Sequence, residues 1–304
     1  MRAFVPLSRL HRPETPWFVR QRELIDEPPE RVWRALTTPT ELAGWWCNRA
    51  DVDLTVGGHV SFSGPSVYGD AEPTATSRCE ILDITENERI EFAWELRGVP
   101  TRLLIELAPV IEGSEVVVTQ TANSLPAWAP GEGSHNWWSV ALPALRSYLE
   151  RGEAALRPDY SSLRAAVEPT YRVAVTNYPW LIWSKLTEPR ELDRWIGTGS
   201  RIDLRPGGAY ELGPGPGPRT ALEIEPEKLL VTDWHEPELP IARMSWRIEE
   251  GELATLVTLT DHGPRPQAES RDQKDRRIFR CLGSILHLKQ LAERGMTPRE
   301  YQEG

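Results

Sequence analysis

The sequence has few of the features that mark secreted or membrane proteins. Its 304 residues include 3 cysteines, Cys47, Cys79 and Cys281, which lie far apart and form no CxxC pair. This usage argues against a disulfide scaffold and fits a reducing compartment. No apolar run approaches the ~18 residues of a membrane span, and residues 1–14 contain no apolar signal-peptide core. We therefore expect a cytoplasmic protein without membrane insertion.

Positive charge is also scarce. The chain has 35 Lys and Arg against 45 Asp and Glu, a formal net charge of −10, which argues against a nucleic-acid partner or an anionic-membrane surface. The locally basic segment 271–280 is interrupted by Asp272 and Asp275. A solvated helix face explains it better than a binding patch does.

Motifs for metal or cofactor chemistry are missing as well. The 6 histidines show no HxH, HxxxH or Cys/His spacing, so we expect no metal site. Nucleophile elbows, phosphate loops and dinucleotide fingerprints are absent, and the GPGPGP run at 213–218 has the wrong spacing and too many prolines. No cofactor is expected.

What the sequence does contain is a long internal repeat. Residues 30–62 recur at 180–212, shifted by 150 positions. The identical pairs are Trp33/Trp183, Leu36/Leu186, Thr37/Thr187, Pro39/Pro189, Glu41/Glu191, Leu42/Leu192, Trp45/Trp195, Asp53/Asp203, Leu54/Leu204, Gly57/Gly207 and Gly58/Gly208. A period this long far exceeds the ~20–50 residues of solenoid repeats, so each copy should be a whole domain. We expect domains at 1–152, with a core from about residue 16, and at 169–304, joined by a linker at 153–168.

Hydrophobic periodicity gives each copy the same order of elements. In the first copy we expect a strand at Trp17–Asp26, helices at Glu30–Thr37 and Glu41–Trp45 with Thr40 as the second cap, and then six strands. A long helix should close it at Ser134–Arg151, with Gly152 as its C-terminal cap. In the second copy the closing helix should span Ser270–Arg294 before Gly295. Short hairpin spacing favours antiparallel sheets, which makes the fold α+β.

This order and these residues resemble the START-like (SRPBCC) superfamily, and within it the group named after the C-terminal domain of the activator of the heat-shock protein ninety ATPase. The resemblance rests on Trp33, Pro39, Trp45-Trp46, Gly57-Gly58 and Trp94, together with their second-copy equivalents, Trp234 included. It implies two tandem helix-grip domains. In each, a curved antiparallel sheet would wrap on a long C-terminal helix beside two short helices, and a cavity would lie between sheet and helix.

The expected ligand-binding residues are those on the closing-helix stripes and on the strands that the helices cover. They are Trp94, Trp138, Leu142 and Leu145 in the first copy, and Trp234, Trp246, Ile278, Ile285 and Leu288 in the second. Apolar stripes at helical spacing are more often plain core, so each single residue has packing as its alternative. Smaller residues at Cys281 and Ala292 suggest a wider second cavity.

Two other features bear on function. Asp233 and His235 point to the same strand face and are weak candidates for a catalytic acid–base pair, as is His262; a polar pair at a strand end is the alternative. Trp45-Trp46 and Trp137-Trp138 are pairs in which one indole should point away from its core neighbour. Such an indole would be exposed at a partner surface or at the contact between the domains, and mere partial burial is the alternative.

The function that follows from the resemblance is non-catalytic binding of a small hydrophobic or amphipathic ligand. Two alternatives remain open: a protein-interaction or co-chaperone-like module with a protein partner, and a cyclase- or hydrolase-like enzyme that uses polar residues of the cavity. The sequence makes an enzyme the less favoured of these readings.

Overall fold

Alternating side chains in Trp17–Ile25 produce the first strand, β1, in which every second residue is buried. The computed structural model describes residues 17–68, 76–124, 137–236, 241–263 and 270–295. The chain forms a first unit, Met1–Ser162, and a second unit, Leu163–Gly304. The expected lead-in at 1–15 and the start of the first closing helix at 134–136 lie outside the described residues.

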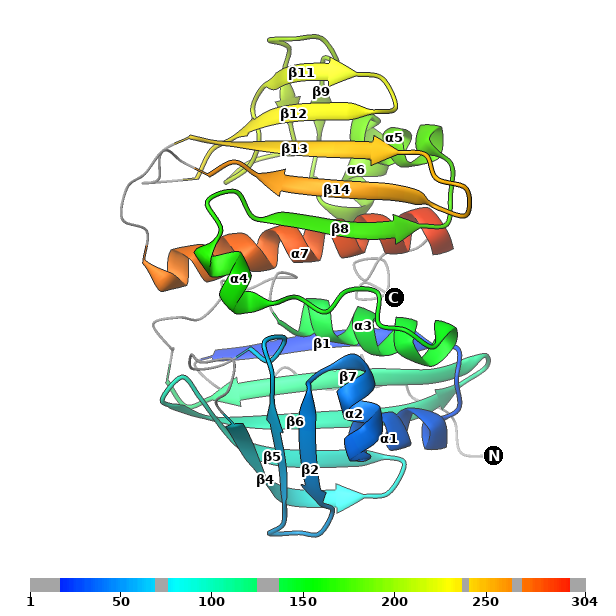
Figure 1. Cartoon of the computed structure of the whole chain (residues 1–304), viewed down its shortest axis with the longest axis vertical. Coiled ribbons are helices and arrows are strands. Elements are labelled where there is room, and N and C mark those ends of the chain that lie inside the picture. Colours follow the sequence, from blue (N-terminus) through cyan, green and yellow to red (C-terminus); the bar gives the residue numbers. More distant parts are fainter. Residues whose placement is uncertain (1–16, 69–75, 125–136, 237–240, 264–269, 296–304) are drawn as a thin grey trace. The chain divides into compact units, whose positions relative to one another are not determined.

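The first unit is one antiparallel sheet with its helices packed against it (Figure 1). The sheet order is β1-β7-β6-β5-β4-β3-β2, and the helix α3 packs on β1. After β1, the elements are α1 (Pro29–Thr37), α2 (Pro39–Trp45), β2 (Arg49–Asp53), β3 (His59–Ser63), β4 (Thr76–Thr85), β5 (Arg89–Leu96), β6 (Val99–Val110), β7 (Gly113–Ala122) and α3 (Trp138–Arg151). A short helix, α4 (Tyr160–Ala165), follows.

The second unit repeats this order. Its five-stranded sheet runs β11-β12-β13-β14-β8, a separate ribbon joins β10 to β9, and α7 packs on β8. The elements are β8 (Thr170–Val175), α5 (Pro179–Thr187), α6 (Pro189–Trp195), β9 (Arg201–Ile202), β10 (Tyr210–Glu211), β11 (Ala221–Glu225), β12 (Leu229–Trp234), β13 (Ala242–Glu249), β14 (Thr255–Asp261) and α7 (Arg271–Arg294). The expected tandem α+β helix-grip fold is confirmed.

One detail of the sequence prediction is wrong. Helix α2 begins at Pro39 and its N-cap is Thr38, not Thr40. Proline has no N–H to lose at the first helical position and its φ is already helical, so it sets the start. The residue before it is held extended, as Thr38 is with φ −100° and ψ 127°. The same arrangement recurs at Glu188 and Pro189 in α6.

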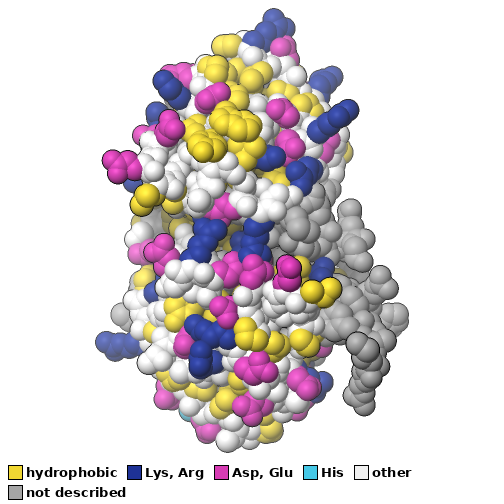
Figure 2. Space-filling model, turned by 90° about the vertical axis from the view of Figure 1, so that its right-hand side faces the viewer, with side chains coloured by type: hydrophobic (Ala, Val, Ile, Leu, Met, Phe, Trp, Pro, Cys, Tyr) yellow, Lys and Arg dark blue, Asp and Glu magenta, His cyan; other side chains and the backbone are white. Residues whose placement is uncertain are grey.

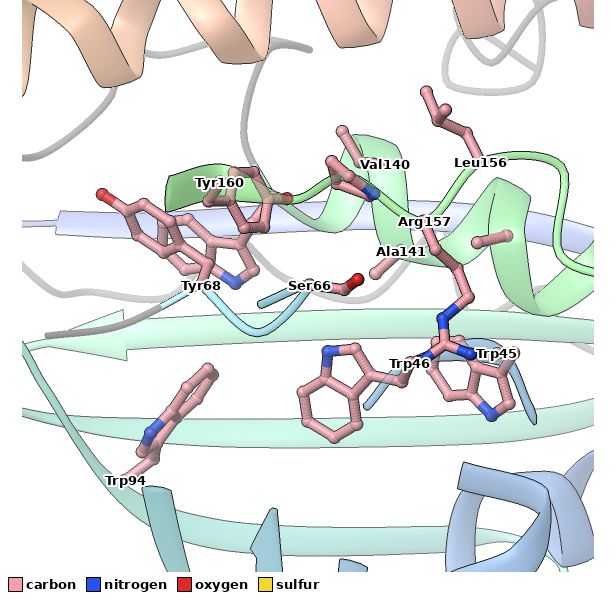
Figure 3. Close-up of a pocket in the computed structure, with 13 residues that line it drawn as sticks. Trp45, Trp46, Ser66, Tyr68, Trp94, Val140, Ala141, Leu156, Arg157 and Tyr160 are labelled. Atoms are coloured by element: carbon pink, nitrogen blue, oxygen red, sulfur yellow. The ribbon is translucent and has the colours of Figure 1, made fainter. Parts of the chain in front are cut away.

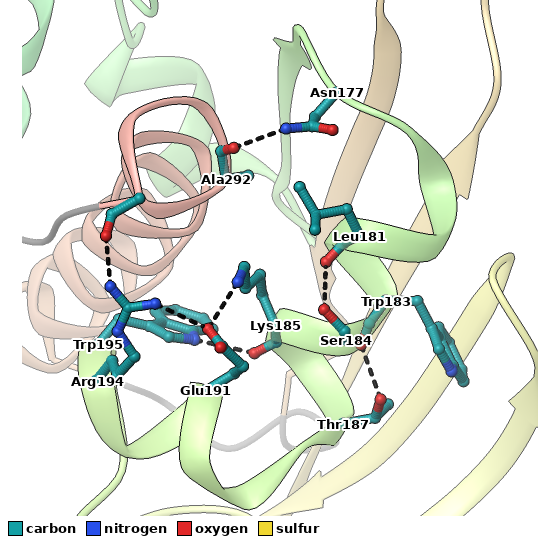
Figure 4. A network of polar contacts seen from close by, with 11 residues as sticks. Asn177, Leu181, Trp183, Ser184, Lys185, Thr187, Glu191, Arg194, Trp195 and Ala292 are labelled. Atoms are coloured by element: carbon teal, nitrogen blue, oxygen red, sulfur yellow. Dashed lines mark hydrogen bonds and ion pairs between the residues drawn. The ribbon is translucent and has the colours of Figure 1, made fainter.

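The matched tryptophans tie the two short helices of each unit together. Trp45 Nε1 donates to the carbonyl oxygen of Ala35 at 3.0 Å, and Trp195 Nε1 donates to that of Lys185 at 3.0 Å. Figure 4 shows the second of these bonds beside the ion pair of Lys185 with Glu191. Both indoles are buried. Each therefore supplies a hydrogen-bond donor to a helix carbonyl that would otherwise lack one.

The matched glycines lie in the turn between β2 and β3 in the first unit and between β9 and β10 in the second. Gly57 and Gly207 have φ of 81° and 79°, which L side chains rarely adopt. A Cβ on the next residue would lie 2.3 Å from Asp53 O at Gly58 and 2.2 Å from Asp203 O at Gly208. Glycine is therefore required at the first position because of the positive φ, and at the second because the backbone leaves no room for a side chain.

Each closing helix ends in the same way. Gly152 and Gly295 adopt left-handed C-caps with φ of 81° and 68°. In the last turn, Glu150 accepts the backbone N–H of Asp26 at 3.1 Å, and Glu293 accepts that of Thr176 at 2.9 Å. These bonds fix the C-terminal end of each helix to the end of its unit's first strand.

The surface carries charges of both signs. Figure 2 shows acidic and basic side chains interspersed on the face that it presents. None of the helices in the described part of the chain is long and apolar enough to cross a membrane.

The indole hydrogen bond predicts a specific loss of stability. Trp195→Phe leaves the buried carbonyl of Lys185 without its donor, so we expect the free energy of unfolding to fall by at least about 1–3 kcal/mol. Trp45→Phe should cost a similar amount in the first unit. Trp180→Phe, at an indole that is 56 % exposed, is the matched control and should change little. Urea unfolding followed by circular dichroism measures all three, and equal losses at Trp195 and Trp180 would contradict the assignment.

Candidate functional site

In the first unit, a cavity lies between the sheet, α2 and α3 (Figure 3). Its volume is about 20 Å³, which is room for roughly one water molecule. The described lining residues are predominantly apolar and aromatic. They are Trp45, Trp46, Ser66, Tyr68, Trp94, Trp137, Val140, Ala141, Ala144, Leu156, Arg157, Pro158 and Tyr160.

Two groups of aromatic rings build the walls. Trp46 lies against Phe62 with ring centroids 4.3 Å apart, and Phe62 meets Trp94 edge-on at 5.8 Å. On the other side, Tyr68 stacks on Trp137 at 5.1 Å and meets Tyr160 edge-on at 5.8 Å. These are the offset and edge-to-face arrangements that ring quadrupoles favour. We call the space between these two groups of rings the aromatic slot.

Residues 156–160, which we call the strap, cover one side of the cavity. Arg157 holds the strap: its Nη1 donates to Ala43 O at 3.0 Å, and its Nη2 donates to Cys47 O at 2.5 Å and to Asn48 Oδ1 at 3.0 Å. Figure 3 shows this side chain reaching from the strap toward Trp45 and Trp46. The carbonyls belong to the end of α2 and the residues just after it, where a cation is favourable.

The other end of the strap is held by its backbone. The N–H of Tyr160 donates to Pro65 O at 3.0 Å, and the Tyr160 ring is buried. The strap thus closes one side of the cavity, and the other walls come from α2, α3, β5 and the segment that follows β3.

A chain of hydrogen bonds lies beside this cavity. Trp138 Nε1 donates to Gln120 Oε1 at 3.0 Å, Gln120 Nε2 donates to Thr101 Oγ1 at 2.8 Å, and Thr101 Oγ1 donates to Trp94 O at 2.7 Å. All its members are neutral. Burial raises the pKa of the nearby Cys47 thiol to about 11 against a lowering by Arg157, so this thiol stays protonated at neutral pH.

The second unit has its own cavity, between its sheet, α6 and α7. Its volume is also about 20 Å³, so the expectation of a wider second cavity is wrong. Trp195 and Trp246, whose rings meet edge-on at 6.2 Å, line it together with Trp234. The described lining residues are Leu186, Leu192, Trp195, Ile196, Tyr210, Leu212, Pro218, Thr232, Trp234, Met244, Trp246 and Ser284.

The structure brings Asp233 and His235 together. Asp233 Oδ2 lies 2.9 Å from His235 Nε2, while Asp233 Oδ1 accepts the backbone N–H groups of Arg219 at 2.7 Å and Thr220 at 2.8 Å. Burial alone would raise the pKa of Asp233, but these hydrogen bonds outweigh it and lower the pKa. The carboxylate therefore anchors the chain before β11 to β12.

His262 has a comparable arrangement. Its Nε2 lies 2.9 Å from Ser245 Oγ and its Nδ1 lies 3.1 Å from Glu168 Oε1. Both ring nitrogens are engaged, which fits a strand-end polar contact. In the described residues, no group of three or more His, Cys, Asp or Glu side chains is arranged to hold a metal ion.

Three of the residues expected to bind a ligand line a cavity: Trp94 in the first unit, and Trp234 and Trp246 in the second. The other six are buried on the closing helices but are not among the described lining residues. They are Trp138, Leu142, Leu145, Ile278, Ile285 and Leu288.

The two tryptophan pairs differ from each other. Trp137 and Trp138 are both buried, so the expectation of an exposed indole is wrong there, whereas Trp45 is buried and Trp46 shows the partial burial that was the alternative. Trp46 stacks on Trp45 with ring centroids 5.7 Å apart and turns into the cavity. Tyr68, Tyr160 and Arg157 were not found from the sequence, since they lie in segments without periodicity.

Comparison with known proteins gives the following matches. The family model described as "Activator of Hsp90 ATPase homolog 1-like protein" matches residues 26–150 and again residues 178–294. No curated protein matches the chain.

Several solved structures are similar. DynU16, a protein of the dynemicin biosynthetic locus, is 20 % identical, with 91 % of this chain and 97 % of that chain covered and a TM-score of 0.38. The Aha1 dimer from Colwellia psychrerythraea is 21 % identical over 45 % of this chain and 99 % of that chain, with a TM-score of 0.38. Protein CV1439 from Chromobacterium violaceum is 24 % identical over 44 % of this chain and 99 % of that chain, with a TM-score of 0.36. Likenesses at this level carry no information about function.

The hydrogen bonds of Asp233 predict a pH-dependent contribution to stability. Its folded pKa lies below the ordinary 3.8, so the contribution is full above about pH 4 and is lost as the pH falls through the lowered value. At pH 7, Asp233→Asn should lower the free energy of unfolding by about 1–3 kcal/mol. The gap to the parent protein should narrow in acid.

Urea unfolding at a series of pH values measures this gap. Glu249→Gln, at an exposed position at the end of β13, is the control and should leave stability nearly unchanged at every pH. A loss at Asp233→Asn that is constant from neutral to acid pH would contradict a role for the charge.

Proposed function

Because the chain belongs to the activator of Hsp90 ATPase homolog 1-like family, with two matching regions in tandem, we propose that it binds a small apolar or amphipathic molecule without transforming it. The observation that carries the proposal is the aromatic slot of the first unit, closed by the strap. The bound molecule would lie between the Trp46 and Tyr68 sides of the slot.

The lining of the slot supports a ligand that is mostly apolar. Four tryptophans and two tyrosines contribute to it, together with aliphatic groups of α3. Flat apolar groups are well suited to such walls, since rings stack on them with little loss of side-chain freedom. Arg157 and Ser66 supply polarity at one side, which suits an amphipathic molecule with one polar end.

The small volume of the cavity means that binding requires the strap to move. Arg157 makes three hydrogen bonds and Tyr160 makes one through its backbone. At about 0.5–1.5 kcal/mol each, their loss costs a few kcal/mol. Burial of about 200 Å² of apolar ligand surface yields roughly 5 kcal/mol. The two quantities are comparable, so a strap of this strength permits binding and still closes the slot.

The lining also favours binding over catalysis. None of the described lining residues of the first cavity is Asp, Glu or His, and Cys47 beside it is held as a thiol. The acid–base candidates Asp233 and His235 lie in the second unit, where Asp233 is occupied by backbone N–H groups. These contacts support a structural role for the pair over that of a cyclase or hydrolase.

A second function, protein binding, is favoured by one observation on α5. Tyr178 and Trp180 are 65 % and 56 % exposed at the start of this helix. The corresponding residues before and in α1 are Pro28 and Glu30. Exposed aromatic residues are typical of protein interfaces, and the family is named after an activator of the Hsp90 ATPase. An interaction or co-chaperone-like role would use this helix and leave the cavity closed.

Filling the first cavity tests the binding proposal. Ala141 lies on α3 at the cavity wall, so Ala141→Trp should occupy the slot and abolish binding of 8-anilinonaphthalene-1-sulfonate to the first unit. Ala174→Trp, at an exposed position of β8, is the matched control. Fluorescence titration measures binding of this probe, and thermal unfolding verifies that both variants fold.

Native mass spectrometry of freshly purified protein provides the complementary test. We expect a discrete excess mass that disappears on denaturation in the parent protein and is missing in Ala141→Trp. No excess mass, together with probe binding that Ala141→Trp leaves unchanged, would reject the cavity as the binding site and favour the surface of α5.

A further inference from the structure

In the second unit, charged and polar side chains are buried between α7 and the strands beneath it. Asp261 at the end of β14 is fully buried. Arg277 on α7 binds both carboxylate oxygens of Asp261: its Nε lies 2.9 Å from Asp261 Oδ2 and its Nη2 lies 2.8 Å from Asp261 Oδ1. This bidentate pair neutralises Asp261 within the cluster.

Arg280, one turn nearer the middle of α7, is held differently. Its Nη1 donates to Glu236 Oε2 at 2.7 Å, and its guanidinium lies over the Trp234 ring, 4.2 Å from the centroid. Its Nη2 is 4.0 Å from Asp261 Oδ2, too far for a hydrogen bond. Its Nε and Nη2 have no hydrogen-bond partner among the described residues.

The Nε and Nη2 atoms of Arg280 lie along the same edge of its guanidinium group. The Nε–H and one Nη–H of a guanidinium are parallel donors whose spacing matches the two oxygens of a carboxylate. Trp234 Nε1 and the Tyr171 hydroxyl are also buried, and in the described part of the chain neither has a partner. Burial raises the pKa of Tyr171, so its hydroxyl remains a donor. Around Arg280, four buried donor atoms of described residues thus have no hydrogen-bond partner.

Buried donors without acceptors are rare and destabilising, and several in one place indicate a missing partner that bears acceptors. We propose that the second unit binds the carboxylate of a small apolar acid, with the Nε and Nη2 edge of Arg280 as its anchor. This inference rests on the proposed binding function, which it extends to the second unit. Trp234 connects the two parts of the site, because it also lines the cavity with Trp195 and Trp246, where the apolar part of the acid belongs.

In the first unit, the described residues at the equivalent positions offer no such anchor. Aligned on the terminal glycines Gly152 and Gly295, Trp137 occupies the place of Arg280 on the closing helix. Gln120, at the place of Asp261 when β7 and β14 are aligned on their pairing with β1 and β8, is already bonded to Trp138 and Thr101. The two units would therefore differ in the ligands that they select, and only the second would require an acid.

Isothermal titration calorimetry of the full chain with 2-naphthoate and with its methyl ester tests whether the second unit binds a carboxylate. The two probes share a ring system and differ in charge. We expect the acid to bind the second unit at least about tenfold more tightly than the ester does. Arg280→Lys keeps the positive charge but loses the two-pronged edge, so it should remove this preference. Arg247→Lys, at an exposed position of β13, is the matched control and should retain it.

Tyr171→Phe gives an independent readout. It removes a buried hydroxyl that lacks a partner, so the free protein should melt at a slightly higher temperature. Affinity for 2-naphthoate should fall while affinity for the ester stays the same. This opposite effect on stability and binding distinguishes a ligand donor from a residue that only holds the fold.

Equal affinities for acid and ester in the parent protein would overturn the inference. They would mean that the donors of Arg280, Trp234 and Tyr171 form hydrogen bonds with water and not with a ligand carboxylate. An acid preference that survives both Arg280→Lys and Tyr171→Phe would also overturn it. In either case ester binding that Ala141→Trp abolishes would leave the proposed function of the first unit intact. Failure of both probes to bind would reject the two proposals together.

Discussion

The hydrogen bond from a buried indole to a helix carbonyl is the contact on which both units depend. Trp45 and Trp195 each reach back to the preceding short helix, where the indole N–H donates to a carbonyl oxygen. The bond fixes the angle between the two short helices and thereby the position of one cavity wall, because Trp45 and Trp195 themselves line the cavities. The same side chain therefore determines the fold and shapes the site.

The two units agree where the backbone is constrained and differ where a ligand would lie. Glu150 and Glu293 make the same helix-to-strand bond, and Gly58 and Gly208 make the same close approach. On the closing helix, by contrast, Trp137 faces Tyr68 in the first unit, while Arg280 lies over Trp234 in the second. After duplication, such a division keeps the folding determinants and frees the cavity residues to change.

Sequence reasoning recovered the fold because its signals are local. Proline before each short helix, glycine after each long one and alternation in the strands all act within a few residues. The lining of the cavities was predicted only in part: Trp94, Trp234 and Trp246 line them as expected from their place on covered strands, and their role in ligand binding stays a prediction. Arg157 and Tyr160 were not, because a strap without periodicity gives no sign of where it docks. Cavity size was misjudged because the small residues of one helix do not determine the volume of a cavity that strands and other helices also line.

If both proposals hold, the two units would bind ligands at different costs. In the first unit the strap's polar groups are satisfied, so a ligand would first have to break those bonds, and the closed state would be stabilised at the expense of affinity. In the second unit the side-chain donors of Arg280, Trp234 and Tyr171 have no hydrogen-bond partner among the described residues, so the free protein would bear the cost and an acceptor would relieve it. The first arrangement would select for apolar area, since only the burial of a large apolar surface could offset the opening of the strap. The second would select for a functional group, since only an acceptor of the right geometry would supply the missing hydrogen bonds.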